Sequence, residues 1–102
     1  MHLVQLLLPL ADRSGNRFPR SAYDDLVRRL TDRFGGVTAY TRSPATGLWE
    51  AESGETVRDL VVVYEVMVEQ LEPEWWAELR RELEARFEQD EIVVRVQTTE
   101  RL

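Results

Sequence analysis

Residues 57–69 read VRDLVVVYEVMVE, and this stretch decides the fold. It is rich in β-branched and aromatic residues, which favour a β-strand. Alternate side chains of a strand point to opposite faces. One face would carry Leu60, Val62, Tyr64, Val66 and Val68, and the other would carry Val61, Val63, Glu65 and Met67. The second set is apolar except at Glu65, so we expect both faces to be covered.

The chain before this strand predicts a strand, a helix and a second strand. Residues 1–10 alternate, with apolar side chains at every even position from Val4 onward. Residues 20–34 place one apolar stripe on a helix, and Gly35-Gly36 provides a left-handed stop. Residues 37–42 again favour a strand. The stripe consists of Tyr23, Leu26, Val27, Leu30 and Phe34.

Residues 43–56 form a polar stretch that contains Pro44 and two glycines and is longer than a hairpin connection needs. We therefore predict a long loop there. Excess length in a loop indicates either function or mobility, and this one contains Trp49, an expensive side chain to leave in water. Whether the 43–56 loop is a lid or merely mobile stays open at this point.

The chain after residue 69 predicts a helix that starts near Pro73 and a last strand at 92–97. Proline and acidic residues are favoured in a first helical turn. The buried stripe of this helix would be Trp76, Leu79, Leu83 and Phe87.

The element order strand-helix-strand-strand-helix-strand predicts an α+β fold, the ferredoxin-like plait, in one domain of residues 1–102. It is a four-stranded antiparallel sheet of order 4-1-3-2 with two helices on one face. We expect the first and third strands to be central neighbours that run parallel. The set facing the helices would be Val4, Leu6, Leu8, Leu60, Val62, Tyr64, Val66, Ile92, Val94 and Val96.

The face without helices, called the open face below, is too apolar to lie simply in water. A second copy of the chain is the first expectation for what covers it, then another protein or the chain's own loop, then a small molecule. The protein would then be a homodimer. The interface candidates are Leu3, Gln5, Leu7, Val61, Val63, Met67 and Val93.

Polar side chains on the open face and around the 43–56 loop are the candidates for a ligand site. Glu65, Gln5 and Arg95 are either a structural cluster inside a dimer or part of a pocket in which an arginine holds a carboxylate. Arginines near an indole can also bind a small anion or an aromatic group. The ligand-binding candidates are Tyr40, Arg42, Trp49, Arg58, Glu65 and Arg95.

Composition excludes several chemistries. The chain has no Cys, and all 13 basic residues are Arg, so thiol nucleophiles and Schiff-base lysines are excluded. His2 is the single histidine, and we expect no metal and no cofactor. A net charge of -6 and a pI near 4.8 argue against nucleic acid. The apolar start of the chain is short and interrupted by Gln5 and Pro9, so we expect no membrane partner and a cytoplasmic location.

Three segments, residues 34–38, 47–49 and 54–59, resemble a family of small uncharacterised bacterial proteins. They read FGGVT, GLW and GETVRD, and a hydrophobic strand follows the last. The resemblance implies a stand-alone domain and adds no catalytic residue.

The sequence thus predicts a small bacterial binding or interaction protein, dimeric through its open face, with enzyme activity uncertain. The alternative is a small cofactor-independent enzyme of the isomerase or oxygenase type, with a pocket at the open face and the 43–56 loop. These two hypotheses differ in what lies over Glu65: a dry interface in the first, a cavity in the second.

Overall fold

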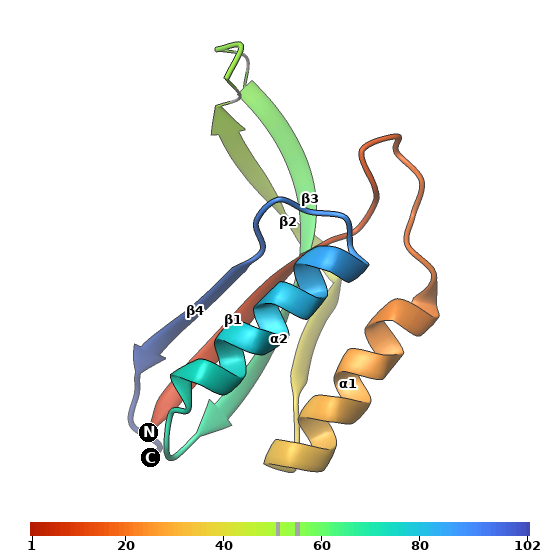
Figure 1. The fold of residues 1–102 in the computed structure, drawn as a ribbon. Helices are drawn as coiled ribbons and strands as arrows, with labels where there is room; N and C mark the ends of the chain where they lie inside the picture. Colours follow the sequence, from red (N-terminus) through yellow and green to blue (C-terminus); the bar gives the residue numbers. More distant parts are fainter. Residues whose placement is uncertain (51, 55) are drawn as a thin grey trace.

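The computed structural model describes the backbone of residues 1–50, 52–54 and 56–102. Side chains are described for the same residues except 42–45, 47, 49, 50 and 56–59. The elements follow the predicted order (Figure 1). They are β1 (His2–Pro9), α1 (Arg20–Phe34), β2 (Thr38–Glu50), β3 (Thr56–Val68), α2 (Pro73–Arg86) and β4 (Val93–Thr98).

The four strands form one antiparallel sheet of order β2-β3-β1-β4, which is 4-1-3-2 read backwards. The predicted fold class is confirmed. The prediction that the first and third strands run parallel is wrong, because β1 and β3 pair antiparallel from His2↔Val68 to Pro9↔Val61. A hairpin joins β2 to β3, so β3 runs against β2, and the crossover through α1 leaves β1 parallel to β2. β3 lies between them and is antiparallel to both.

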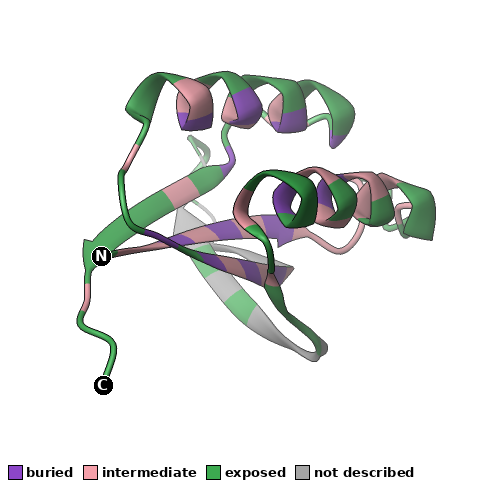
Figure 2. Ribbon diagram, turned by 90° about the horizontal axis from the view of Figure 1, so that it is seen from below, coloured by how far each residue is buried: buried purple, intermediate pink, exposed green. Residues whose placement is uncertain are grey.

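Both helices cover the same side of the sheet, and the core lies between these two layers (Figure 2). Helix α1 ends where the sequence indicates: Gly35 is left-handed, with φ 83°, and its N–H donates to the Thr31 carbonyl at 2.8 Å. Such an end favours glycine because a Cβ is strained at positive φ. The buried side chains are Val4, Leu6, Leu8, Leu26, Leu30, Val62, Tyr64, Val66, Val68, Trp76, Leu79, Leu83, Phe87 and Ile92.

Two residues of the set predicted to face the helices are exposed instead. Leu60 is 47% exposed and pairs with Thr46 of β2, on the far side of the register shift between Tyr40 and Ala45. Val96 lies on the edge strand β4, of which only Val94 packs against the core. The alternation of side chains along each strand assigned both residues to the correct face of the sheet. It gives no information on how far the helices extend over that face.

The prediction of a 43–56 loop is wrong. Strand β2 continues to Glu50 and pairs with β3 out to Glu50↔Thr56. The register shifts between Tyr40 and Ala45, and Pro44 falls inside that irregularity, where its missing N–H removes no regular ladder bond. The result is a long hairpin that projects past the helices (Figure 1). Its projecting part, residues 41–50 of β2 with 56–61 of β3, is called the hairpin arm below. The molecule has a longest dimension of 42 Å.

Three ion pairs join α1 to α2 or to Glu72, the residue just before α2. They are Asp25 with Arg86, Arg29 with Glu82 and Arg33 with Glu72. The α1 members are spaced four residues apart, so they share one face of that helix. The Arg33 guanidinium also lies 4.6 Å from the centre of the Trp75 ring, a cation–π contact.

The Asp25 pair predicts a pH-dependent stability. Hydrogen bonds from Arg86 and Arg28 lower the pKa of Asp25 below its ordinary value of 3.8. A carboxyl with a lowered folded-state pKa stabilises the fold above its unfolded pKa, and this is lost as pH falls through the folded pKa. We expect Asp25→Asn to lower Tm modestly at pH 7, because the pair is solvent-exposed.

Thermal unfolding of both proteins at pH 7 and at stepwise lower pH measures this effect. The Tm difference should shrink to zero as the pH falls below 3.8. A Tm difference that does not change with pH would contradict the stabilising role of the Asp25 carboxylate. Asp32→Asn, an exposed change on the same helix, is the control.

Candidate functional site

The open face carries one row of polar side chains across all four strands. In the register of the sheet, Gln5 of β1 lies directly opposite Glu65 of β3 on one side and Arg95 of β4 on the other. Tyr40 of β2 pairs with Val63 and so lies diagonally beside Glu65. These four residues, Tyr40, Glu65, Gln5 and Arg95, are called the polar row below.

Hydrogen bonds connect the polar row from end to end. The Gln5 Nε2 donates to Glu65 Oε1 at 2.6 Å, and Arg95 Nε donates to Gln5 Oε1 at 2.7 Å. Only one orientation of the Gln5 amide satisfies both neighbours, because its nitrogen donates to the carboxylate and its oxygen accepts from the guanidinium. Gln5 therefore bridges the Glu65 carboxylate and the Arg95 guanidinium.

Tyr40 completes the surroundings of the Glu65 carboxylate. Its hydroxyl donates to Glu65 Oε2 at 3.2 Å, and this hydrogen bond raises the pKa of the Tyr40 phenol above 10.0. Tyr40 is thus a protonated donor at neutral pH. Both described donors to Glu65, Gln5 and Tyr40, are neutral groups, and among the described residues no cation lies within ion-pair distance of this carboxylate.

Apolar side chains surround the polar row on the open face. Met67 and Val93 are 44% and 45% exposed. The other apolar interface candidates, Leu3, Leu7, Val61 and Val63, are half-buried on the same face. All of them have the parity opposite to the core residues of β1 and β3, as the alternation predicts. A carboxylate that has no cationic partner among the described residues is an unusual feature of an apolar surface.

The structure brings three of the six ligand-binding candidates together: Tyr40, Glu65 and Arg95. The side chains of the other three, Arg42, Trp49 and Arg58, lie outside the described residues. Their backbones belong to the hairpin arm, where Trp49 pairs with Val57 and Arg58 with Leu48. The predicted site made of these three side chains therefore stays a prediction.

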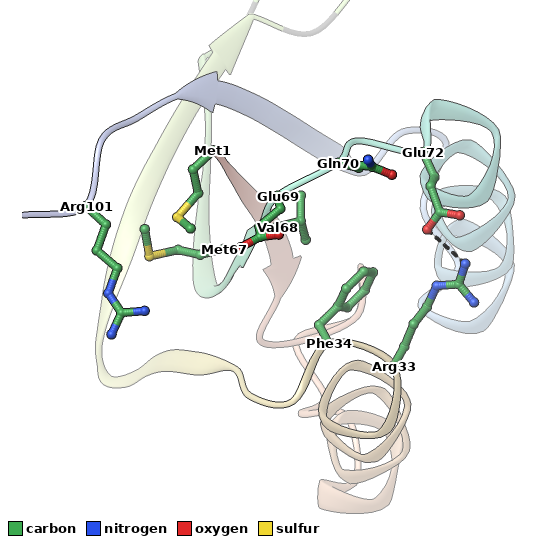
Figure 3. A pocket seen from close by; sticks show the side chains of 9 residues that line it. All are labelled: Met1, Arg33, Phe34, Met67, Val68, Glu69, Gln70, Glu72 and Arg101. Atoms are coloured by element: carbon green, nitrogen blue, oxygen red, sulfur yellow. Dashed lines mark hydrogen bonds and ion pairs between the residues drawn. The ribbon is translucent and has the colours of Figure 1, made fainter.

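A surface hollow of about 680 Å³ lies at the end of the sheet where β1 begins and β3 ends (Figure 3). Met67 lines this hollow and also belongs to the open face, two residues from Glu65 along β3. Met1 and Arg101 lie on the side of Met67, and the Arg33–Glu72 ion pair lies on the opposite side (Figure 3).

Sequence reasoning missed this hollow and the bridging role of Gln5. The hollow combines the start of β1, the end of α1, the β3–α2 connection and the chain end, and no motif links these segments. The role of Gln5 had a signal, since alternation already placed it on the same face as Glu65 and Arg95. Only the observed register shows that it lies between them.

Neither a cluster of metal-ligating side chains nor a membrane-spanning helix is found in the part of the chain that the structure describes. In residues 1–50, 52–54 and 56–102, no three His, Cys, Asp or Glu residues cluster so as to hold a metal ion. Within the same ranges, no helix is both long enough and apolar enough to cross a bilayer.

Comparison with known proteins gives a structural match. No family model and no curated protein matches the chain. A phage SAM lyase structure in complex with S-methyl-5'-thioadenosine matches with a TM-score of 0.64 and 18% identity, over 94% of this chain and 79% of that chain. A phage SAM lyase structure in the apo state matches at 0.60 and 17%, over 94% and 78%. At these identities the matches establish a shared fold, one that serves as an enzyme fold in those lyases.

Proposed function

We propose that this protein is a small enzyme that binds a sulfonium nucleoside of the SAM (S-adenosylmethionine) type on its open face and releases a thioether nucleoside from it. The observation that carries this proposal is the Glu65 carboxylate, which accepts hydrogen bonds from two neutral donors and lies among apolar side chains. The fold shared with two SAM lyase structures supports it.

The chemistry of a sulfonium matches the surroundings of Glu65. A sulfonium carries a positive charge but no N–H or O–H donor, and its three substituents are carbon atoms. Its binding site needs a negative charge and apolar contacts rather than additional acceptors. Glu65 supplies the charge, and Leu7, Val63 and Met67 supply apolar surface beside it. The donors from Gln5 and Tyr40 keep the carboxylate in place.

The adenosine part has a place to lie in this arrangement. Met67 is two residues from Glu65 on the same face, about 6.7 Å along the strand. An adenosine attached to a sulfur at Glu65 reaches across Met67 into the hollow of about 680 Å³. The thioether of methionine makes favourable contacts with aromatic rings. The side chains of Met67 and Met1, which both line the hollow, can therefore pack against a purine ring.

Incubation of the purified protein with SAM tests the activity. Formation of S-methyl-5'-thioadenosine breaks the bond between sulfur and the methionine side-chain carbon, and the electron pair goes to sulfur. The amino-acid fragment leaves after losing a proton or closing on its own carboxylate, so no co-reactant is required. We expect this thioether to accumulate in chromatography, and SAM to bind in calorimetry. Absence of both would reject the proposal.

The second candidate is an interaction protein that dimerises through its open face, and the symmetry of the polar row favours it. Glu65 and Arg95 flank Gln5 on either side. A two-fold axis along β1 would put Glu65 of each copy over Arg95 of the other, twice. Val63 and Val93 would face each other in the same way, since both pair with Leu7.

Solution mass separates the two candidates when it is measured with ligand binding. Light scattering over a hundredfold range of concentration detects a dimer of this 11.9 kDa chain. A stable dimer that binds no SAM favours the interaction protein. A protein that binds SAM through Glu65 favours the enzyme, whatever its mass.

A further inference from the structure

The Arg95 guanidinium has hydrogen-bonding capacity that the described residues leave unused. Gln5 Oε1 accepts from its Nε. Among the described residues, no carboxylate lies within ion-pair distance of its two terminal nitrogens. Two parallel N–H donors at the end of a guanidinium match the two oxygens of a carboxylate.

The polar row has a fixed order of charge: negative at Glu65, neutral at Gln5, positive at Arg95. Adjacent strands are about 4.8 Å apart, so Glu65 and Arg95 originate about 10 Å from each other. The Gln5 amide hydrogen-bonds to both side chains and keeps this spacing. A ligand with a cation near one end and a carboxylate a few bonds away complements the row in a single orientation.

We propose that Arg95 binds the carboxylate of the ligand's amino-acid part and thereby distinguishes a nucleoside that carries an amino acid from one that does not. This rests on the proposed function, in which Glu65 takes the sulfonium. The adenosine then lies toward Met67, and the amino-acid part lies across β1 toward β4. Arg95 is a specificity-determining residue in this arrangement, and the bond that breaks lies nearer to Glu65.

Three probes separate the contacts in the binding experiment. SAM has both the sulfonium and the amino acid, S-adenosylhomocysteine has the amino acid with a neutral thioether, and S-methyl-5'-thioadenosine has neither charge centre. We expect Arg95→Gln to weaken binding of SAM and S-adenosylhomocysteine about tenfold each and to change binding of S-methyl-5'-thioadenosine less than twofold. Calorimetry with the full chain measures all three.

A lysine variant and the salt dependence test whether Arg95 acts through its charge and its paired N–H donors. Arg95→Lys keeps the positive charge but lacks the paired N–H donors of the guanidinium, so it should recover only part of the affinity lost in Arg95→Gln. Added salt should reduce the preference of the wild type for S-adenosylhomocysteine over S-methyl-5'-thioadenosine, because Arg95 is exposed. Arg81→Gln, an exposed change on α2, is the matched control and should leave all three affinities unchanged.

The outcomes are distinguishable. The role of Arg95 would be overturned if Arg95→Gln weakened the binding of all three probes equally or of none. The proposed function would still be supported by binding of SAM to the wild type. If the wild type binds none of the probes, the proposed function fails and this inference fails with it. Arg95 lies on an edge strand and is exposed, so its variants are expected to fold.

Discussion

Phe87→Ala is expected to destabilise the protein by about 3–5 kcal/mol, the largest effect of any single change considered. Phe87 is 0% exposed and directly follows α2. Its ring contacts Phe18 edge-on, with centroids 4.9 Å apart, and Tyr23 at 5.2 Å. It therefore joins the end of α2 to α1 and to the connection that leads into α1. Its removal leaves a cavity where three segments meet.

Chemical and thermal unfolding measure this change. For a chain of this length, the expected loss corresponds to a fall in Tm of about 20 °C. Phe87→Leu fills most of the space, so it should retain much of the stability and give a folded reference if the alanine variant does not fold. Leu48→Ala, at a residue that is 63% exposed in the hairpin arm, is the control. A loss below about 1 kcal/mol for Phe87→Ala would contradict this packing.

The sequence predicts the layers of the fold because periodicity reports burial directly. The α1 stripe, the glycine stop at Gly35 and the opposite parities of β3 are local signals, and each matches the structure. The sense of β1 relative to β3 is a property of the connections, so the strand patterns did not contain it. The hairpin arm was missed because Pro44 and Gly47 indicate a loop, whereas the register shift lets the ladder continue past them.

The site was predictable as a set of residues but not as a geometry. Alternation placed Glu65, Gln5 and Arg95 on one face, because side-chain direction follows from position in a strand. It gave no information on which atoms meet. The bridge through Gln5 depends on the pairing of β1 with both β3 and β4, and the Tyr40 contact depends on the register before the irregularity in β2. Long-range pairing of this kind leaves no trace in a single sequence.

Glu65→Gln is expected to weaken SAM binding by about 30-fold, because a carboxylate near a sulfonium contributes roughly 2 kcal/mol after solvent screening. S-adenosylhomocysteine, which has no positive sulfur, should lose at most about threefold. The fold should persist, since the new amide oxygen can replace Oε1 and accept from Gln5, while the new amide N–H can donate to the Tyr40 hydroxyl oxygen. Calorimetry with both nucleosides and a Tm measurement check these expectations, and Glu78→Gln on exposed α2 is the control.

The same variant shows how Glu65 acts on the reaction. The positive charge on sulfur disappears as the C–S bond breaks, so a carboxylate beside it stabilises bound SAM more than the transition state. We therefore expect Glu65→Gln to raise KM for SAM strongly and to leave kcat unchanged or higher. A large fall in kcat with unchanged KM would mean that Glu65 acts on the reacting atoms as a base. Equal losses for SAM and S-adenosylhomocysteine would instead show that Glu65 only shapes the surface, and the sulfonium would have to bind elsewhere.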